Sequence, residues 1–82
     1  MIQIDLKKNF RREYKALCDL ELYIKTYNDT FTMIISEEFE PKYHFTLRCF
    51  IDQEECYMYS AETLDDIIDF LNQVKRNLDE YN

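Results

Sequence analysis

The longest helical pattern in the chain runs from Ser60 to Tyr81. Its apolar residues recur at alternating steps of three and four, which is the spacing of one face of an α-helix. They are Leu64, Ile67, Leu71, Val74, Leu78 and Tyr81, with Ile68 and Phe70 at the sides of the stripe. Thr63 followed by Asp66 is a capping-box-like start, and acidic residues there suit the positive end of the helix dipole. The sequence therefore predicts a long amphipathic helix that packs on another layer.

A second helical pattern lies near the start of the chain. Its apolar residues, at steps of four, four and three, are Leu6, Phe10, Tyr14 and Leu17. With Asp5 as N-cap, we predict a helix from Asp5 to about Cys18. The flanks of this helix are basic, and two interpretations stay open: a solvated face, or a site for phosphate or acidic groups. The second interpretation uses Lys7, Lys8, Arg11 and Arg12.

Between these helices the apolar residues alternate with polar ones, which is typical of β-strands. Four strands are predicted, over residues 20–25, 30–36, 43–51 and 56–59. Asn28 and Asp29 tolerate positive φ and would form the first turn, while the segment 37–42 contains the only Pro and forms the second. Consecutive strands with such short connections pair antiparallel. The strand 43–51 is the longest and is expected at the centre of the sheet.

The predicted fold is α+β: a four-stranded antiparallel meander with two helices, in the order αββββα. Each helix has one apolar stripe, so both are expected on one face of the sheet, in a two-layer arrangement. Residues 1–82 then form a single small domain. The other sheet face would be uncovered and would carry Tyr23, Phe50 and either Tyr57 or Tyr59. An exposed aromatic surface of this kind predicts a partner or a second copy, so a homodimer is possible.

Composition excludes several classes of function. Apolar residues make up 46% and aromatic residues 16% of the chain, which is too rich for a disordered protein. The chain has no Gly, so it cannot form a P-loop, a dinucleotide fingerprint or a nucleophile elbow. Cys18, Cys49 and Cys56 have no paired spacing, which favours reduced thiols. Because there is no apolar run of membrane-span or signal-peptide kind, the expected location is the cytoplasm.

Catalytic and metal chemistry has few candidate residues. His44 is the only His, and no nucleophile and base motif accompanies it. His44, Cys49 and Cys56 lack the spacing of zinc ligands, and the segment 52–55 lacks the Gly turn of a calcium loop. The sequence therefore predicts a protein that is not an enzyme and that has no cofactor and no metal site.

Charge gives the clearest functional signal. The net charge is −7, which argues against direct binding of nucleic acid. The first 19 residues hold five basic and three acidic residues, whereas the rest hold five basic and fourteen acidic residues. In the predicted meander, the turn after the second strand and the start of the last helix lie at one end of the sheet. The predicted partner-binding residues at that end are Glu37, Glu38, Glu40, Glu62, Asp65 and Asp66.

In size, acidity and lack of catalytic motifs the chain is similar to small phage-borne inhibitors, including anti-CRISPR proteins and DNA-mimic proteins. This resemblance implies a stoichiometric inhibitor. Carboxylates spread over a small rigid body imitate a row of phosphates, so we expect them to occlude a basic, nucleic-acid-binding groove of another protein. The alternatives are an immunity protein or antitoxin that neutralises a basic toxin, and a structural or adaptor subunit that binds through its aromatic sheet face. Solubility alone would also explain an acidic surface.

Overall fold

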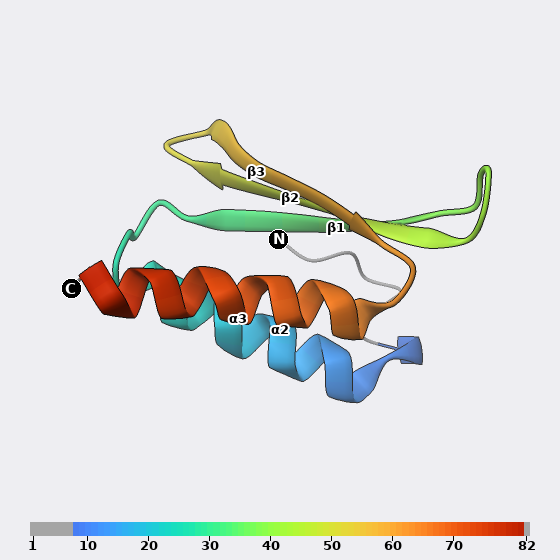
Figure 1. The fold of residues 1–82 in the computed structure, drawn as a ribbon, viewed down its shortest axis with the longest axis horizontal. Coiled ribbons are helices and arrows are strands. Elements are labelled where there is room, and N and C mark those ends of the chain that lie inside the picture. Colours follow the sequence, from blue (N-terminus) through green and yellow to red (C-terminus); the bar gives the residue numbers. More distant parts are fainter. Residues whose placement is uncertain (1–7, 82) are drawn as a thin grey trace.

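The computed structural model describes residues 8–81, and Figure 1 shows a sheet with two helices packed on one of its faces. The elements in chain order are α2 (Arg11–Lys25), β1 (Thr32–Glu38), β2 (His44–Ile51), β3 (Glu54–Ala61) and α3 (Leu64–Tyr81). The three strands lie in the order β1-β2-β3, and both neighbouring pairs are antiparallel. The fold is therefore α+β, and β2 is the central strand.

The prediction of four strands is wrong, because residues 20–25 form the second half of α2. Leu17, Leu20 and Ile24 are buried at steps of three and four, which is the helical period. Leu22, which the alternating pattern placed on the same face as Leu20 and Ile24, is 64% exposed. The predicted hairpin turn at residues 28 and 29 instead connects a helix to the first strand.

The boundaries of α2 also differ from the prediction. The predicted N-cap, Asp5, lies outside the described residues. Within them, Lys8 and Asn9 are helical, but Phe10 interrupts the helix with φ −135° and ψ 60°. The ring of Phe10 packs edge-on against Phe45, with 5.7 Å between the ring centroids. Phe10 therefore packs against the core at the point where the helix is interrupted. α2 begins directly after it and extends past the expected end at residue 18.

The three-stranded meander sets the directions of the helices. With an odd number of strands between them, α2 and α3 run the same way along the sheet (Figure 1). The β1–β2 turn, the exit of β3 and the starts of both helices lie at one end, which we call the β1–β2 end. The other end, which we call the β2–β3 end, holds the β2–β3 turn and the last residues of α3. Each end is thus built from segments that are distant in the sequence.

The two-residue β2–β3 turn has two consecutive positive φ values although it contains no Gly. Asp52 and Gln53 have φ values of 53° and 68°, and Ile51 pairs with Glu54 directly across the turn. Two consecutive positive φ values are typical of a type I′ turn, whose twist matches that of the flanking strands. Asp tolerates this conformation better than most residues, whereas Gln is a less favourable choice.

The core lies between the sheet and the helix layer. The buried residues are Leu17, Leu20 and Ile24 from α2, Phe31 before β1, Met33 and Ile35 from β1, Phe45, Leu47 and Cys49 from β2, and Leu64, Ile67, Leu71 and Val74 from α3. They form one cluster, which confirms the predicted stripe of α3 over its first three turns. At the C-terminal end of α3 the stripe leaves the core, since Leu78 is only partly buried and Tyr81 is 89% exposed. Within residues 8–81, no helix is long and apolar enough to cross a membrane.

Candidate partner-binding surfaces

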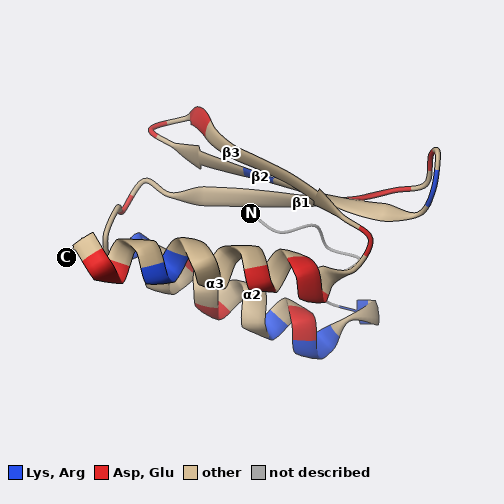
Figure 2. Ribbon diagram, viewed as in Figure 1, with Lys and Arg blue, Asp and Glu red and all other residues tan. Residues whose placement is uncertain are grey.

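The acidic residues predicted to bind a partner lie on two chain segments at the β1–β2 end. They are Glu37, Glu38 and Glu40 around the β1–β2 turn, and Glu62, Asp65 and Asp66 at the β3–α3 junction. Figure 2 shows acidic residues on both segments. The two segments share an end because β1 and β3 each pair antiparallel with β2 and therefore finish on the same side. This arrangement does not depend on the fourth strand that the structure lacks.

Glu37 and Glu38 are held by hydrogen bonds to the other arm of the hairpin. Tyr43 donates its hydroxyl to Glu37 Oε2 over 2.8 Å. His44 spans two acceptors, because its Nδ1 lies 2.7 Å from the carbonyl oxygen of Lys42 and its Nε2 lies 3.1 Å from Glu38 Oε2. The side chain of His44 is only 20% exposed, whereas that of Glu38 is 48% exposed. Both carboxylates are therefore oriented by the hairpin and still reach solvent.

An open hollow of about 440 Å³ lies between the β1–β2 turn and the exit of β3. Its lining residues are Pro41, Lys42, His44, Ser60, Ala61 and Glu62. Lys42 Nζ lies 4.0 Å from Glu62 Oε1, and the two side chains are 81% and 73% exposed. An ion pair this exposed contributes little to stability and exchanges partners easily. Glu62 is therefore able to leave Lys42 for a cation on another protein.

The start of α3 presents carboxylates that the fold uses only weakly. Thr63 Oγ1 accepts a hydrogen bond from the backbone N–H of Asp66 over 3.2 Å, which confirms the predicted capping role of Thr63. Asp65 and Asp66 are exposed in the first helical turn, where the helix dipole favours negative charge. Within residues 8–81, neither of them forms an ion pair, nor does Glu40.

Basic residues border this acidic surface on one side. Arg11 and Arg12 are exposed at the start of α2, and Lys8 is exposed just before it, at the same end of the molecule (Figure 2). The negative potential of the β1–β2 end is therefore strongest on its sheet and α3 side and weaker beside α2. A phosphate-binding role for these residues stays a prediction, and Lys7 lies outside the described residues.

At the β2–β3 end, Asp79 of α3 accepts hydrogen bonds from two tyrosines. Tyr23 is on α2, and Tyr27 lies two residues after the end of α2. Tyr23 donates its hydroxyl to Asp79 Oδ1 over 2.8 Å, and Tyr27 donates to the same oxygen over 2.5 Å. The hydrogen bond from Tyr27, followed by that from Tyr23, lowers the pKa of Asp79 below its ordinary value. The hydrogen bond to Asp79 raises the pKa of Tyr27 in turn. Lys75 Nζ lies 4.5 Å from the centroid of the Tyr23 ring and completes the cluster.

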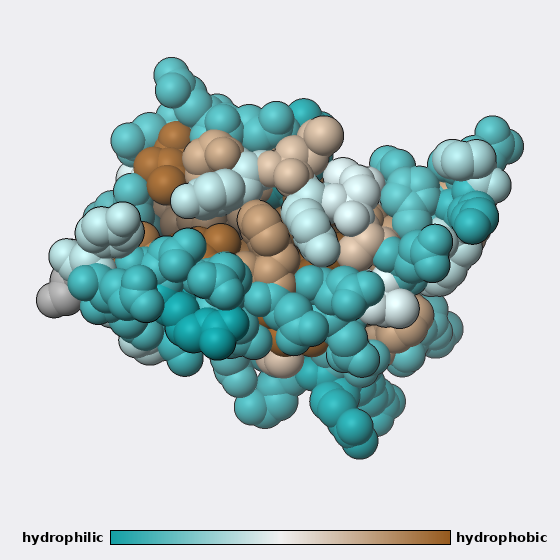
Figure 3. All heavy atoms as spheres, viewed as in Figure 1, coloured by the Kyte–Doolittle hydropathy of each residue, from teal (hydrophilic) through white to brown (hydrophobic). Residues whose placement is uncertain are grey.

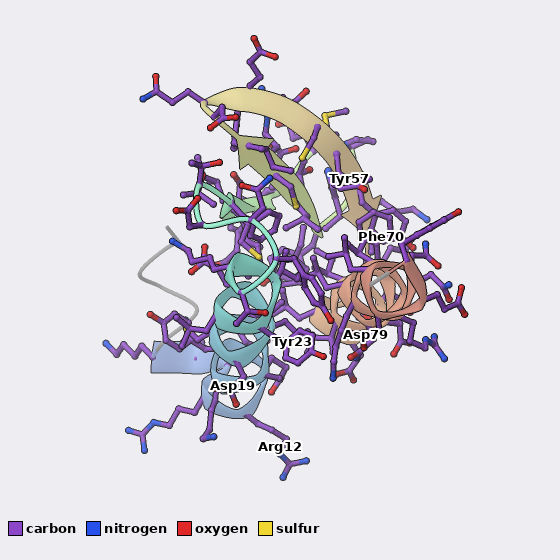
Figure 4. All side chains as sticks on the ribbon, turned by 90° about the vertical axis from the view of Figure 1, so that its left-hand side faces the viewer. Arg12, Asp19, Tyr23, Tyr57, Phe70 and Asp79 are labelled. Carbon is purple, nitrogen blue, oxygen red and sulfur yellow. The ribbon has the colours of Figure 1, made fainter. Side chains whose placement is uncertain are left out.

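This cluster was missed in the sequence, although its spacing was visible. Tyr23 and Tyr27 are four residues apart, as are Lys75 and Asp79, which is the spacing of side chains on one face of a helix. In the structure Lys75 and Asp79 both lie on α3, whereas Tyr23 lies on α2 and Tyr27 just after its end. The helical spacing of the tyrosines was hidden by the prediction of a strand for residues 20–25. Figure 4 shows Tyr23 pointing from α2 toward Asp79 on α3. The cluster joins the two helices and is not an acidic surface available to a partner.

The predicted aromatic sheet face does not exist in the form expected. Of its four candidates, only Phe50 lies on the face opposite the helices, where it pairs with Thr32. Tyr23 belongs to α2. Tyr57 and Tyr59 pair with Cys49 and Leu47, which are buried under the helices, so their side chains point to the helix side as well.

The uncovered face is mixed rather than aromatic. Arg48 Nε donates to Glu55 Oε1 over 2.7 Å, and its guanidinium carbon lies 5.9 Å from the centroid of the Phe50 ring. Ile34 and Met58 pair with Arg48 from either side. The hypothesis of an adaptor that binds through an aromatic sheet face therefore loses the surface on which it was based.

The cysteines do not gather into a site. Cys49 is fully buried, and burial raises the pKa of its thiol to about 12. Cys56 donates its thiol to the carbonyl oxygen of Cys49 over 3.4 Å. Within residues 8–81, no group of three or more His, Cys, Asp and Glu side chains is arranged to hold a metal ion.

No protein-family model matches the chain, and neither a curated protein nor a solved structure matches it.

Proposed function

We propose that this chain is a non-catalytic inhibitor that binds another protein through the acidic side of its β1–β2 end. The partner presents a basic groove that otherwise holds nucleic acid, and the carboxylates of this end take the place of phosphates there. The observation that carries the proposal is the convergence of six acidic residues from two distant segments on one end of a small rigid fold.

Exposure of these carboxylates supports the proposal. Glu40, Asp65 and Asp66 are exposed and have no ion-pair partner within the described residues. Glu62 has only the exposed contact with Lys42. Carboxylates that contribute little to folding are available to meet Lys and Arg side chains of a partner.

Their positions also support it. Asp65 and Asp66 are fixed on the first turn of a helix, and Glu37 and Glu38 on the end of a strand. Charges on regular elements lose little conformational freedom when they bind, as is expected of a surface that replaces the fixed phosphates of a nucleic acid. The proposal includes a cytoplasmic location, which the free thiols of Cys18, Cys49 and Cys56 favour.

The test uses two triple variants that remove the same charge from opposite ends. The first, Glu40→Gln, Asp65→Asn and Asp66→Asn, acts on the β1–β2 end. The matched control, Asp29→Asn, Asp52→Asn and Glu54→Gln, acts on the β2–β3 end. A partner is first captured from lysate on the immobilised wild-type chain, and its affinity for wild type and both variants is then measured by titration at two salt concentrations.

The proposal expects the first variant to bind at least about tenfold more weakly, since each carboxylate facing a partner cation is worth roughly 2 kcal/mol or more. The control variant should bind nearly as the wild type does, and wild-type binding should weaken as salt rises. The captured partner should also release a labelled DNA or RNA duplex when the chain is added. A first variant that binds as wild type does at both salt concentrations would reduce the acidic surface to a solubilising one. Equal losses in both variants would mean that net negative charge, and not the β1–β2 end, attracts the partner. A partner that binds no nucleic acid would favour the immunity-protein alternative.

A further inference from the structure

A smaller hollow than the one beside Lys42 lies at the β1–β2 end, between the starts of α2, β2 and α3. Its volume is about 180 Å³. Sites for small molecules and cofactors usually measure about 300 to 1,000 Å³, so this hollow is too small for a ligand of that size. At about 30 Å³ for each water of the liquid, it holds the volume of roughly six waters, which suits one long side chain. Figure 3 shows residues of low polarity among hydrophilic ones at this end, on the right-hand side of the view.

Aromatic rings form much of the wall of the hollow. Its apolar lining residues are Phe10, Tyr43, Phe45 and Leu64. Phe45 and Leu64 belong to the buried core, whereas Phe10 is half-buried and Tyr43 is 43% exposed. The ring of Phe45 packs against Phe10 and Tyr43, with 5.7 Å and 5.2 Å between the ring centroids. Because the hydrogen bond from Tyr43 to Glu37 also holds the more exposed ring, the wall needs little rearrangement when a side chain enters.

Three carboxylates from three different segments surround this wall. They are Glu13 on α2, Glu62 after β3 and Asp65 on α3. Glu13 is half-buried and has no ion-pair partner among residues 8–81. Lys8 and Arg11 are exposed at the same end of the molecule but do not line the hollow. Like charges around one apolar hollow repel each other, and a cation between them removes that repulsion, so charge complementarity selects a cationic occupant.

Of the two common cationic side chains, arginine suits this combination of rings and carboxylates better. Its guanidinium is planar, stacks on aromatic faces and pairs with two carboxylate oxygens at once. The ammonium of lysine is a compact and strongly hydrated charge, which loses more when it leaves water. The apolar stem of arginine would also cover Phe45 and Leu64, the most buried of the lining residues.

We propose that this hollow binds one arginine side chain of the partner protein. The guanidinium lies against the rings of the wall, and its N–H groups donate to Glu13 and Asp65. The nature of the partner rests on the proposed function, in which a basic groove faces the β1–β2 end. The site adds Phe10, Glu13 and Tyr43 to the binding surface, and none of them is among its six acidic residues. An arginine enclosed in this way is typical of the few side chains that dominate the affinity of an interface.

The first test uses small probes and needs no partner. Acetyl-arginine methylamide, acetyl-lysine methylamide and acetyl-citrulline methylamide are titrated into the isotope-labelled chain, and its amide signals are followed by NMR. Citrulline has the shape of arginine without the charge, and lysine has the charge without the planar head group. Glu13→Gln removes one carboxylate of the hollow. Glu54→Gln is the matched control, because Glu54 is exposed at the β2–β3 end, and the amide spectra verify that both variants are folded.

The arginine probe should bind to saturation and shift the amide signals around Glu13, Tyr43 and Leu64. The lysine and citrulline probes should bind wild type at least about fivefold more weakly, and Glu13→Gln should bind the arginine probe at least about fivefold more weakly, whereas Glu54→Gln should bind it as wild type does. No saturable binding of arginine overturns the proposal. So do equal affinities for arginine and either other probe, or shifts spread over the acidic residues of both ends, which would show general attraction of cations.

The second test measures the affinity of the captured partner for the same two variants. Glu13→Gln should weaken binding about tenfold, because it leaves the arginine with one carboxylate fewer, and Glu54→Gln should change it little. Unchanged affinity for Glu13→Gln overturns the proposal even where the arginine probe binds.

The two proposals fail in different ways. A partner that binds Glu13→Gln normally but loses affinity for the triple variant Glu40→Gln, Asp65→Asn and Asp66→Asn contradicts only the arginine site. A partner that binds no nucleic acid but loses affinity for Glu13→Gln contradicts the proposed function and leaves the arginine site intact.

Discussion

The two ends of this molecule carry similar numbers of carboxylates and use them differently. At the β2–β3 end, Asp79 accepts hydrogen bonds from Tyr23 and Tyr27 and holds α3 to α2. At the β1–β2 end, Asp65 and Glu40 are exposed without an ion pair among the described residues. The comparison separates carboxylates that the fold itself uses from carboxylates that remain exposed and available to a partner.

The largest effect should come from the core that both ends share. Leu71 is fully buried in the middle of α3, and Leu71→Ala should lower the free energy of unfolding by about 2 to 5 kcal/mol. Urea unfolding followed by far-UV circular dichroism and by tyrosine fluorescence measures the loss. Because one cluster contains the whole core, both signals should shift together. Separate transitions would mean that the two ends unfold independently and belong to two folding units.

A smaller loss is expected from Asp79→Asn, which weakens the hydrogen bonds from Tyr23 and Tyr27. The pKa of Asp79 is lowered in the folded state, so its charged form stabilises the fold above the ordinary aspartate pKa of about 3.9. That contribution disappears as the pH falls through the lower pKa of the folded state. The free energies of unfolding of wild type and Asp79→Asn, measured in urea, should therefore differ at pH 7 and be closer to each other at pH 3.

Asp69→Asn is the control for this prediction, because Asp69 is exposed on the same helix. It should change stability less than Asp79→Asn does at pH 7. If both substitutions have the same effect at both pH values, the hydrogen bonds from Tyr23 and Tyr27 to the charged Asp79 do not stabilise the fold.

The acidic end should tolerate charge removal in the free protein. The triple variant Glu40→Gln, Asp65→Asn and Asp66→Asn should change the free energy of unfolding by no more than about 1 kcal/mol, most of it from the lost helix-dipole interaction. Thermal unfolding measures this, with the triple variant of the β2–β3 end as control. A large loss would show that these carboxylates serve the fold and would weaken their assignment to a partner.

The smallest effect should come from the turn of the β2–β3 end, and it should be favourable. Gln53 has φ 68°, which Gly adopts without steric cost. Gln53→Gly should therefore raise the free energy of unfolding by about 0.5 kcal/mol, a gain that the greater freedom of Gly in the unfolded chain limits. Thr32→Gly, on an exposed strand position, should instead destabilise the protein. A loss of stability in Gln53→Gly would mean that the Gln side chain contributes to the turn.

The strong local patterns of the sequence determined much of this fold. The stripe of α3, its Thr63 cap and three of the strands follow from spacing that allows one interpretation. The acidic end was also predictable, because antiparallel neighbours bring the end of β1 and the end of β3 together whatever precedes them.

Tertiary structure decided the rest where local spacing was ambiguous. Leu20, Leu22 and Ile24 fit a strand by alternation, but Leu17, Leu20 and Ile24 fit a helix, and packing in the core selected the helix. The bulge at Cys56 shifts the register of β3 against β2 by one residue, so that Tyr57 points to the helix side. Local spacing limits which residues can share a face, but only contacts between distant segments decide between the alternatives and what the chosen face covers.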